Sequence, residues 1–245
     1  GLASPTRGVI AHGGDPFTNV IDKITIASQG VDASDFGDTT SARETSGGGS
    51  SSTRGVIMGG YFSADTNSID FITIASAGNA TDFGDTLTST HAAGGCASPT
   101  RGIMAGGWPG INVIEYVTIA STGNSTDFGD RVQTQHSVTG CSSQTRGVFG
   151  GGDSPAADNL IDYITIATTG NAAEFGDGLI DENNRFPGAA ASPTRAVWVG
   201  GYASSQRNHI ASNMIATLGN SIEFGELTGS YSQHFGTSNC HGGLG

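Results

Sequence analysis

The side chains of this sequence that could do chemistry are histidines and a glutamate at repeated positions. His91 and His136 lie 45 residues apart, and each is followed five residues later by a cysteine, Cys96 or Cys141. Glu44 has the matching place one repeat earlier. Because imidazole and carboxylate groups suit zinc or a similar ion, these three residues are candidate metal ligands. The alternative, which we favour, is that the histidines hydrogen-bond backbone carbonyls where a strand begins, so we expect neither metal nor cofactor.

The cysteines and hydroxyl residues do not indicate a catalytic centre. Cys96 and Cys141 hold equivalent places, and a cysteine inside a strand is usually a small buried hydrophobe. A disulfide between them is the alternative, and it needs Cα atoms within about 7 Å. No nucleophile is paired in the sequence with a convincing base and an orienting acid. We therefore expect no enzymatic activity.

Aromatic residues form a second candidate site, because they follow Gly-Gly pairs in segments that differ from repeat to repeat. These residues are Phe17, Tyr61, Phe62, Trp108 and Tyr202. Flat aromatic faces beside Asp, Asn and Ser suit sugar rings, whose C–H faces stack while their hydroxyls hydrogen-bond. The sequence predicts a rim that binds glycan or a partner, with Trp108 the best candidate because Pro109 restrains its loop. The alternative is that these aromatics pack against adjacent repeats or another subunit.

Composition excludes several classes of protein. The 245 residues carry 10 Lys and Arg against 22 Asp and Glu, for a formal net charge of −12. Phosphate binding needs clustered Lys and Arg, so we expect no nucleic-acid partner. No apolar run approaches the roughly 18 residues that span a bilayer, so we expect no membrane insertion. The 40 glycines and few charges also argue against a helical bundle.

One unit of 45–49 residues is repeated along the whole chain. A Thr-Arg pair leads to Gly-Gly, then to an Ile-Thr-Ile run, a glycine turn and a Phe-Gly pair. The repeat arginines, to which we assign a structural role, are Arg7, Arg54, Arg101, Arg146 and Arg195. Self-similarity at this period is typical of propellers and solenoids.

Short strands, rather than helices, fill each unit. The runs are β-branched and bounded by Gly, Asn or Ser, and none has a sustained helical period. In the third unit we expect strands at 91–97, 101–105, 113–120 and 127–132. Four antiparallel strands per unit indicate a propeller blade. The sequence therefore predicts one all-β domain over residues 1–245, a five-bladed β-propeller.

The two ends of the chain predict how the ring closes. The chain opens within a repeat, and His234 to Cys240 is similar to His91 to Cys96. We expect the C-terminal segment to supply the first strand of the blade that continues at Arg7, so that N- and C-terminal strands share one blade and close the ring. We also expect each repeat arginine to pair with an acid of its own or an adjoining blade and to hydrogen-bond loop carbonyls.

The repeat resembles known families. The order His, Arg, Gly-Gly, Ile-Asp/Glu-Tyr, aromatic is similar to a kelch-type repeat, with Phe128 where that family usually has Trp. The runs at 146–152 and 161–167 resemble repeat modules of virion structural proteins, of the tail or fibre type, from marine bacteriophages. The last repeat departs from this sequence pattern, because Ala211 and Ser212 replace the acid and the aromatic.

The resemblance implies a non-enzymatic propeller on a virion surface or in the extracellular space. Such a module serves assembly or attachment, with other virion proteins, a further copy of itself or a host cell-surface glycan as partners. The alternative function is a free-standing, secreted, lectin-like propeller with several equivalent sugar sites. An isolated soluble ring that bears several equivalent bound sugars would favour the lectin.

Overall fold

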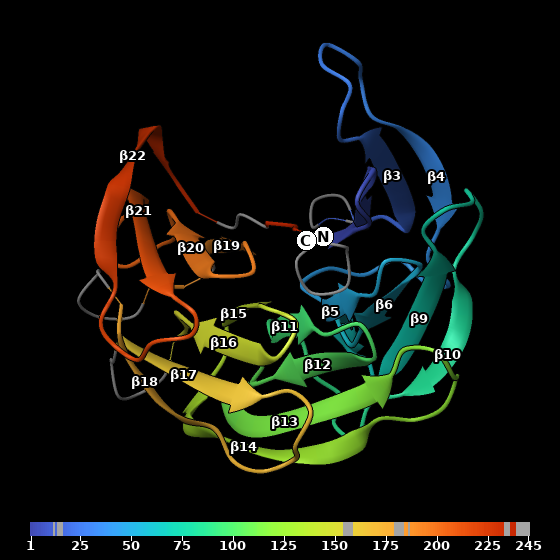
Figure 1. Cartoon of the computed structure of the whole chain (residues 1–245). Coiled ribbons are helices and arrows are strands. Elements are labelled where there is room, and N and C mark those ends of the chain that lie inside the picture. Colours follow the sequence, from blue (N-terminus) through green and yellow to red (C-terminus); the bar gives the residue numbers. More distant parts are fainter. Residues whose placement is uncertain are drawn as a thin grey trace.

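The chain forms a β-propeller of five blades. The computed structural model describes residues 1–11, 13, 17–153, 159–178, 184–185, 187–232 and 236–238. In this part of the chain every helix-or-strand element is a strand, and five antiparallel sheets of four strands each are arranged around a common centre (Figure 1). The predictions of an all-β protein, five blades and four strands per blade are confirmed.

Each blade is numbered in chain order, and its strands run from the centre outward. Blade 1 contains β1 (Leu2–Ala3), β2 (Arg7–Ala11), β3 (Val20–Thr25) and β4 (Ser34–Asp38). Blade 2 contains β5 (Gly47–Ser50), β6 (Arg54–Met58), β9 (Ser68–Thr73) and β10 (Thr81–Asp85), with the small hairpin β7 (Tyr61–Phe62) and β8 (Ala64–Asp65) inserted. Blade 3 contains β11 (Gly94–Ala97), β12 (Arg101–Ala105), β13 (Ile111–Thr118) and β14 (Thr126–Gln135). Blade 4 contains β15 (Thr139–Ser142), β16 (Arg146–Gly150), β17 (Leu160–Thr165) and β18 (Ala173–Asp177), and blade 5 contains β19 (Gly188–Ala191), β20 (Arg195–Val199), β21 (Arg207–Met214) and β22 (Ile222–Tyr231).

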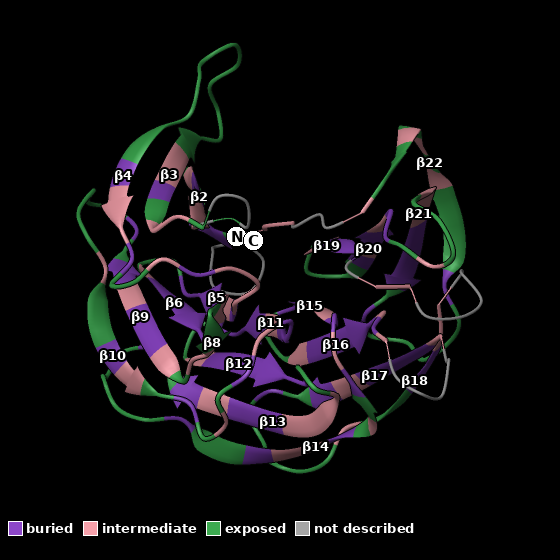
Figure 2. Ribbon diagram, turned by 180° about the vertical axis from the view of Figure 1, so that it is seen from behind, coloured by how far each residue is buried: buried purple, intermediate pink, exposed green. Residues whose placement is uncertain are grey.

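The middle strands of blades 2, 3 and 4 are buried on both faces because each of these blades packs between two neighbouring blades. In β6, Val56, Ile57 and Met58 are all buried although successive side chains point to opposite faces. Figure 2 shows this burial along the inner strands, with exposed residues gathered on outer strands and loops. The core is thus a series of apolar layers between blades, which is why the repeat reads as short apolar runs rather than as strict alternation.

A turn of glycine and asparagine fastens each of blades 2 to 5 to the preceding one. In blade 3 the Gly123 amide donates to the Phe83 carbonyl of blade 2, while Asn124 Oδ1 accepts from the Asp85 amide at 3.0 Å. A Cβ on Gly84 would meet the Gly123 carbonyl oxygen at 2.6 Å, so this close approach requires glycine. The same clamp is repeated by Asn79, Asn171 and Asn220, which accept from the amides of Asp38, Asp130 and Asp177.

The repeat arginines also join neighbouring blades, but they do so without the acidic partners that we expected. Arg101 Nη1 donates to the Ile166 carbonyl of blade 4 at 2.7 Å, and its guanidinium lies 4.4 Å from the Tyr116 ring centroid. Within the described residues no repeat arginine forms an ion pair. The expectation of arginine–acid pairs is therefore wrong, whereas the expected bonds to carbonyls are present. The equivalent bonds join Arg7 to Ile74, Arg54 to Ile119 and Arg146 to Ile215.

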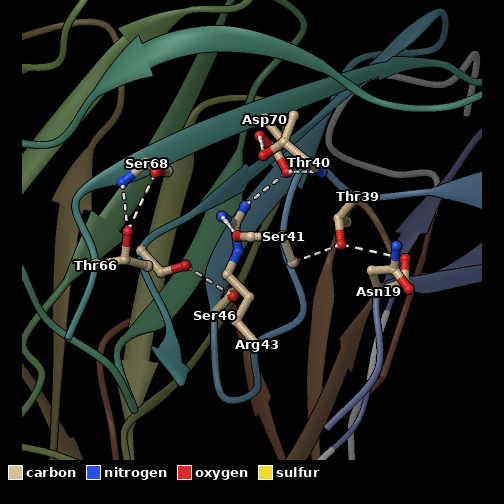
Figure 3. A network of polar contacts seen from close by, with 10 residues as sticks. Asn19, Thr39, Thr40, Ser41, Arg43, Ser46, Thr66, Ser68 and Asp70 are labelled. Carbon is tan, nitrogen blue, oxygen red and sulfur yellow. Dashed lines mark hydrogen bonds and ion pairs between the residues drawn. The ribbon is translucent and has the colours of Figure 1, made fainter. Parts of the chain in front are cut away.

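The repeated acids instead bind the loop that leaves the preceding blade. Asp70, in β9, accepts hydrogen bonds from the Thr40 amide and hydroxyl and pairs with the buried Arg43 at 2.9 Å (Figure 3). Asp162, in β17, does the same with Arg131 and the Val132 amide. These carboxylates are satisfied by groups on a neighbouring blade, so they hold blades together.

Blade 5 has Ala211 where these acids stand. A cavity of about 40 Å³ lies beside Ala211, lined also by Trp198, His209 and Ser221. The methyl group is too small to fill the volume that a carboxylate and its cation occupy at the Arg43–Asp70 and Arg131–Asp162 contacts. The departure of the last repeat from the pattern therefore has a packing consequence.

The closure of the ring differs from our expectation. The first strand of blade 1 is β1, in which Leu2 and Ala3 pair with Val9 and Gly8 of β2. The C-terminal segment therefore does not supply that strand in the described part of the chain, and residues 233–235 and 239–245 lie outside it. The pairing of β1 with β2 explains the difference, because one sheet edge accepts one strand. Blades 5 and 1 stand apart in Figure 1, with the N-terminus near the centre.

Candidate functional site

The loops after the Gly-Gly pairs of blades 2 to 5 lie on one rim because each is fixed to the start of an inner strand. The two glycines have φ angles of 64° and 124° at Gly59–Gly60, and the pairs in blades 3, 4 and 5 are alike, so the chain turns there in a conformation that favours glycine. The next residue then bonds across to the residue that precedes the inner strand. These backbone pairs are Glu44 with Tyr61, His91 with Trp108, His136 with Asp153 and Arg185 with Tyr202.

Four of the five predicted rim aromatics meet in a continuous row with the two histidines. We call this row the aromatic belt; it consists of Phe17, Tyr61, Phe62, His91, Trp108 and His136. Phe17 lies 5.2 Å from Phe62 and 6.2 Å from Tyr61, measured between ring centroids. Tyr61 lies 5.1 Å from His91, which stacks on Trp108 at 5.9 Å. Trp108 then meets His136 edge-on at 4.8 Å.

Charged groups continue the row beyond His136. Asp153 Oδ2 lies 3.8 Å from His136 Nε2 and 2.7 Å from Arg185 Nε. At the other histidine, Asp65 Oδ1 and His91 Nδ1 form a hydrogen bond of 2.6 Å. Burial lowers the pKa of His136, against the opposing effect of Asp153, and Arg185 lowers it further. The belt therefore carries a neutral imidazole between an indole and an acid at neutral pH.

Exposure of the belt is uneven and greatest at its aromatic members. Trp108 is 46 % exposed and Phe62 is 54 % exposed, while His91 and His136 are partly buried beside them. Two imidazoles thus pack against one half-exposed indole, which keeps part of its apolar surface open to solvent. Exposed aromatic surface of this kind is suited to contact with the C–H face of a sugar or with an aromatic group of a partner.

One member of the belt, His91, lines a central cavity. This cavity has a volume of about 560 Å³ and is lined by Glu44, His91, and the glycine-rich strands β5 and β11. Inner-strand glycines such as Gly48 and Gly95 have no side chain to fill the cavity, and a Cβ on Gly95 would meet the Gly48 carbonyl oxygen at 2.2 Å. The inner strands of neighbouring blades therefore pack closely on one another around this cavity.

Tyr202 is the rim aromatic that the structure does not bring into the belt. Its backbone pairs with Arg185, and its ring makes no ring contact in the described part of the chain. The link to the belt runs instead through the Arg185 side chain and Asp153. Sequence reasoning missed the roles of Asp65 and Asp153, which lie in the variable segments where no repeat pattern marks them.

The candidate metal ligands His91, His136 and Glu44 are not arranged like the ligands of a metal centre. His91 and His136 both pack on Trp108. Glu44 lies at the cavity mouth with its backbone paired to Tyr61. Among the described residues no group of three or more His, Cys, Asp or Glu side chains is placed to hold a metal ion. His234 lies outside those residues.

The two equivalent cysteines behave as buried apolar residues. Cys96 and Cys141 are free thiols, and each belongs to an apolar cluster between blades. Burial raises the pKa of the Cys96 thiol strongly, so the thiolate is suppressed. The alternative of a disulfide between them is not found.

These features define the chain as a five-bladed β-propeller with a row of aromatic and charged side chains, one of which, His91, lines its central cavity. Comparison with families of known proteins and with curated proteins finds no match. The part of the chain that the structure describes has no helix long and apolar enough to cross a membrane.

Proposed function

We propose that this chain is a non-enzymatic attachment propeller that binds glycan at the aromatic belt. The observation that carries the proposal is Trp108, half exposed and held between His91 and His136. An indole that already packs against two imidazoles loses little freedom when a sugar contacts it, so its exposed apolar area is available for binding.

Polar groups beside the indole supply the second requirement of a sugar site. Asp65 and Asp153 are carboxylates at the two histidines, and Arg185 adds donors next to Asp153. Sugar hydroxyls both donate and accept hydrogen bonds, and such groups fix their orientation. Aromatic faces flanked by these charges therefore favour a neutral polyol over an apolar ligand.

The setting that we propose for this activity is a virion surface, with other virion proteins or further copies of the chain as partners. Support comes from the resemblance of residues 146–152 and 161–167 to phage virion modules and of the repeat to kelch-type propellers. A propeller with a variable rim on a constant scaffold suits attachment, because the rim changes while the blades stay the same.

A secreted lectin with several equivalent sites is the second candidate. The rim argues against it, because the residue after Gly-Gly is Tyr61, Trp108, Asp153 and Tyr202 in blades 2 to 5. Equivalent backbone positions carrying different chemistry make one composite site rather than repeated ones. Electron microscopy of native particles distinguishes the two: an isolated ring with several equivalent bound sugars would favour the lectin.

The test of the proposed function is binding of Trp108→Ala to a glycan array or to host cells. We expect binding to weaken by about 1–3 kcal/mol, the range of an aromatic anchor, while thermal stability changes little. Phe224→Ala is the matched control, because Phe224 is an exposed aromatic in β22 and not a belt member. Unchanged binding of Trp108→Ala would remove the belt as the site, and lost stability without a binding change would make Trp108 a packing residue.

A further inference from the structure

The faces of blades 5 and 1 that look toward each other carry interface residues that lack a partner. In the other four blades the phenylalanine of the Phe-Gly pair is 2 % exposed, whereas Phe224 of blade 5 is 55 % exposed. On the opposite side, Ile74, Ile119, Ile166 and Ile215 are at most 2 % exposed, whereas the equivalent Ile26 of blade 1 is 50 % exposed. Phe224 and Ile26 thus each belong to one side of a blade–blade interface that is complete at the four other junctions.

The polar groups of this junction are likewise unused. Arg195 makes no bond to a carbonyl of another blade among the described residues, unlike the four other repeat arginines. A Cβ on Gly225 would meet nothing within 4 Å, whereas at Gly84 and its other equivalents it would meet the glycine turn of the next blade. The outer face of blade 5 therefore has the shape and the bonding groups that receive a following blade.

Blade 1 is not suited to be that following blade. Its glycine turn reads Gly30-Val31, so it lacks the asparagine that accepts from the preceding blade at the other four junctions. The turn is also one residue longer before Phe36 than the equivalent turns. Its glycine has a φ of 69° rather than the values near 150° that the others adopt. Direct docking of blade 5 on blade 1 would leave the Glu226 amide without its side-chain acceptor.

The C-terminal segment shows where a further blade begins. Ser238 Oγ accepts from the Ala191 amide of β19 at 3.3 Å. In the same way, Ser50 Oγ of β5 accepts a hydrogen bond from the Ala3 amide of β1, and Ser142 Oγ of β15 accepts one from the Ala97 amide of β11. In both of those cases the serine belongs to the inner strand of the next blade. Ser238 is therefore placed against blade 5 as the inner strand of a sixth blade would be.

A backbone contact supports the same register. A Cβ on Gly236 would meet the Ala189 carbonyl oxygen, just as one on Gly95 would meet Gly48. Gly236 and Ala189 are 47 residues apart, as are Gly95 and Gly48. Since β1 already pairs with β2, the segment 236–238, which is not itself a strand, lies against β19 in the position of a further inner strand rather than in blade 1.

From these contacts we infer that the outer face of blade 5 is a docking surface for a sixth blade of the same repeat type, built outward from residues 236–238. Every blade of this chain adds its strands from the centre outward in chain order, so three further strands would follow that segment. Their Gly-Asn turn would cover Phe224 and accept from the Glu226 amide. A carbonyl at the end of their third strand would accept from Arg195. Their Thr-Arg pair would bind the Ile26 carbonyl of blade 1.

The test compares the 245-residue chain with an extended chain in which residues 239–245 are replaced by a copy of residues 98–135. In the 245-residue chain, Phe224→Ala should lower Tm by less than about 2 °C, whereas the matched Phe128→Ala should lower it by about 6–12 °C. In the extended chain, Phe224→Ala should become about as costly as Phe128→Ala. The proposal is overturned if Phe224→Ala is already costly in the 245-residue chain, which means that blade 1 covers it, or if it stays silent in a folded extended chain.

A second measurement decides the matter if the extended chain does not fold. Ser238→Ala in the 245-residue chain should speed amide hydrogen exchange at Ala191, as the control Ser142→Ala should at Ala97, several-fold in each case. Exchange in β2 should not change. Faster exchange of β2 amides, or no change at Ala191, would mean that the segment does not extend the ring from blade 5. Neither result bears on glycan binding, so this inference and the proposed function can fail independently.

Discussion

The replacement of Arg101 by alanine tests whether the repeat arginines hold blades together. The Arg101 guanidinium donates to the Ile166 carbonyl of the next blade and stacks on Tyr116 of its own blade. A hydrogen bond from a charged donor contributes about 1.5–3 kcal/mol, and a partly exposed cation–π contact contributes about 0.5–1 kcal/mol. We therefore expect Arg101→Ala to lower the free energy of unfolding by about 2–4 kcal/mol.

Arg195 provides the matched control within the same chain. It occupies the equivalent place in blade 5, is exposed and, among the described residues, makes no carbonyl bond to another blade; Ser212 stands where Tyr116 would be. Its guanidinium lies 5.6 Å from the ring of Phe224, which is itself exposed. Arg195→Ala should therefore cost less than about 1 kcal/mol.

Urea unfolding of both variants, followed by circular dichroism and by tryptophan fluorescence, gives the comparison. Arg101→Lys adds a further point, because lysine keeps the charge and a donor but not the planar stack, so its cost should fall between those of the wild type and the alanine variant. Equal losses at Arg101 and Arg195, or a neutral Arg101→Ala, would refute the assignment of these arginines to the blade junctions.

Two further predictions concern buried ionisable groups. Burial raises the pKa of Glu115 above its ordinary 4.5, although the Ser125 hydroxyl and the Leu87 amide donate hydrogen bonds to its carboxylate. Between pH 4.5 and the raised pKa, the native state therefore binds more protons than the unfolded state. Stability should therefore decrease as pH rises from about 4.5 through the raised pKa, and Glu115→Gln should flatten this part of the pH profile in urea melts; a profile identical to that of the wild type would contradict it. Cys96 and Cys141 should resist alkylation by iodoacetamide in the native protein and react in urea, because both are buried and the pKa of Cys96 is raised; rapid native labelling at either peptide in mass mapping would contradict this.

The sequence predicted what depends on repetition alone. Five copies of one unit fix five blades, and the strand expected at 101–105 coincides with β12. The meeting of Phe17, Tyr61, Phe62 and Trp108 on one face also follows from repetition, because equivalent loops of equivalent blades share a rim. Sequence order and spacing contain this information, since a ring places each repeat like the last.

What repetition cannot indicate is which repeated group bonds to which. Arginines and acids recur with the same period, so their spacing permits a pair between them as readily as the observed partners. The structure separates the two: Arg101 reaches a carbonyl of blade 4, while Asp70 binds the amide of Thr40 in the loop from blade 1. These bonds depend on how blades are offset along the axis, which a one-dimensional period does not contain.

The position of the C-terminal segment escaped prediction for a related reason. Its similarity to the start of an inner strand was visible, but the identity of the blade that it adjoins was not. An inner strand lies against its own blade and also against the inner strands of the neighbouring blades, as β11 lies against β5 and β15. Closure of the ring was inferred from the contact with its own blade, whereas the bond between Ser238 and Ala191 is a contact with the preceding blade.

The belt and the junctions divide the chain into positions that must repeat and positions that are free to differ. A junction residue such as Asn124 faces the preceding copy of the same unit, so the same group satisfies the same partner at the four junctions from blade 1 to blade 5. The residue after Gly-Gly is held by a backbone pair with the start of the inner strand, and that pair places no demand on its side chain. Tyr61, Trp108 and Asp153 therefore occupy one framework with three chemistries. A propeller built in this way can change what its rim binds without changing how its blades pack, which is the property that an attachment surface requires.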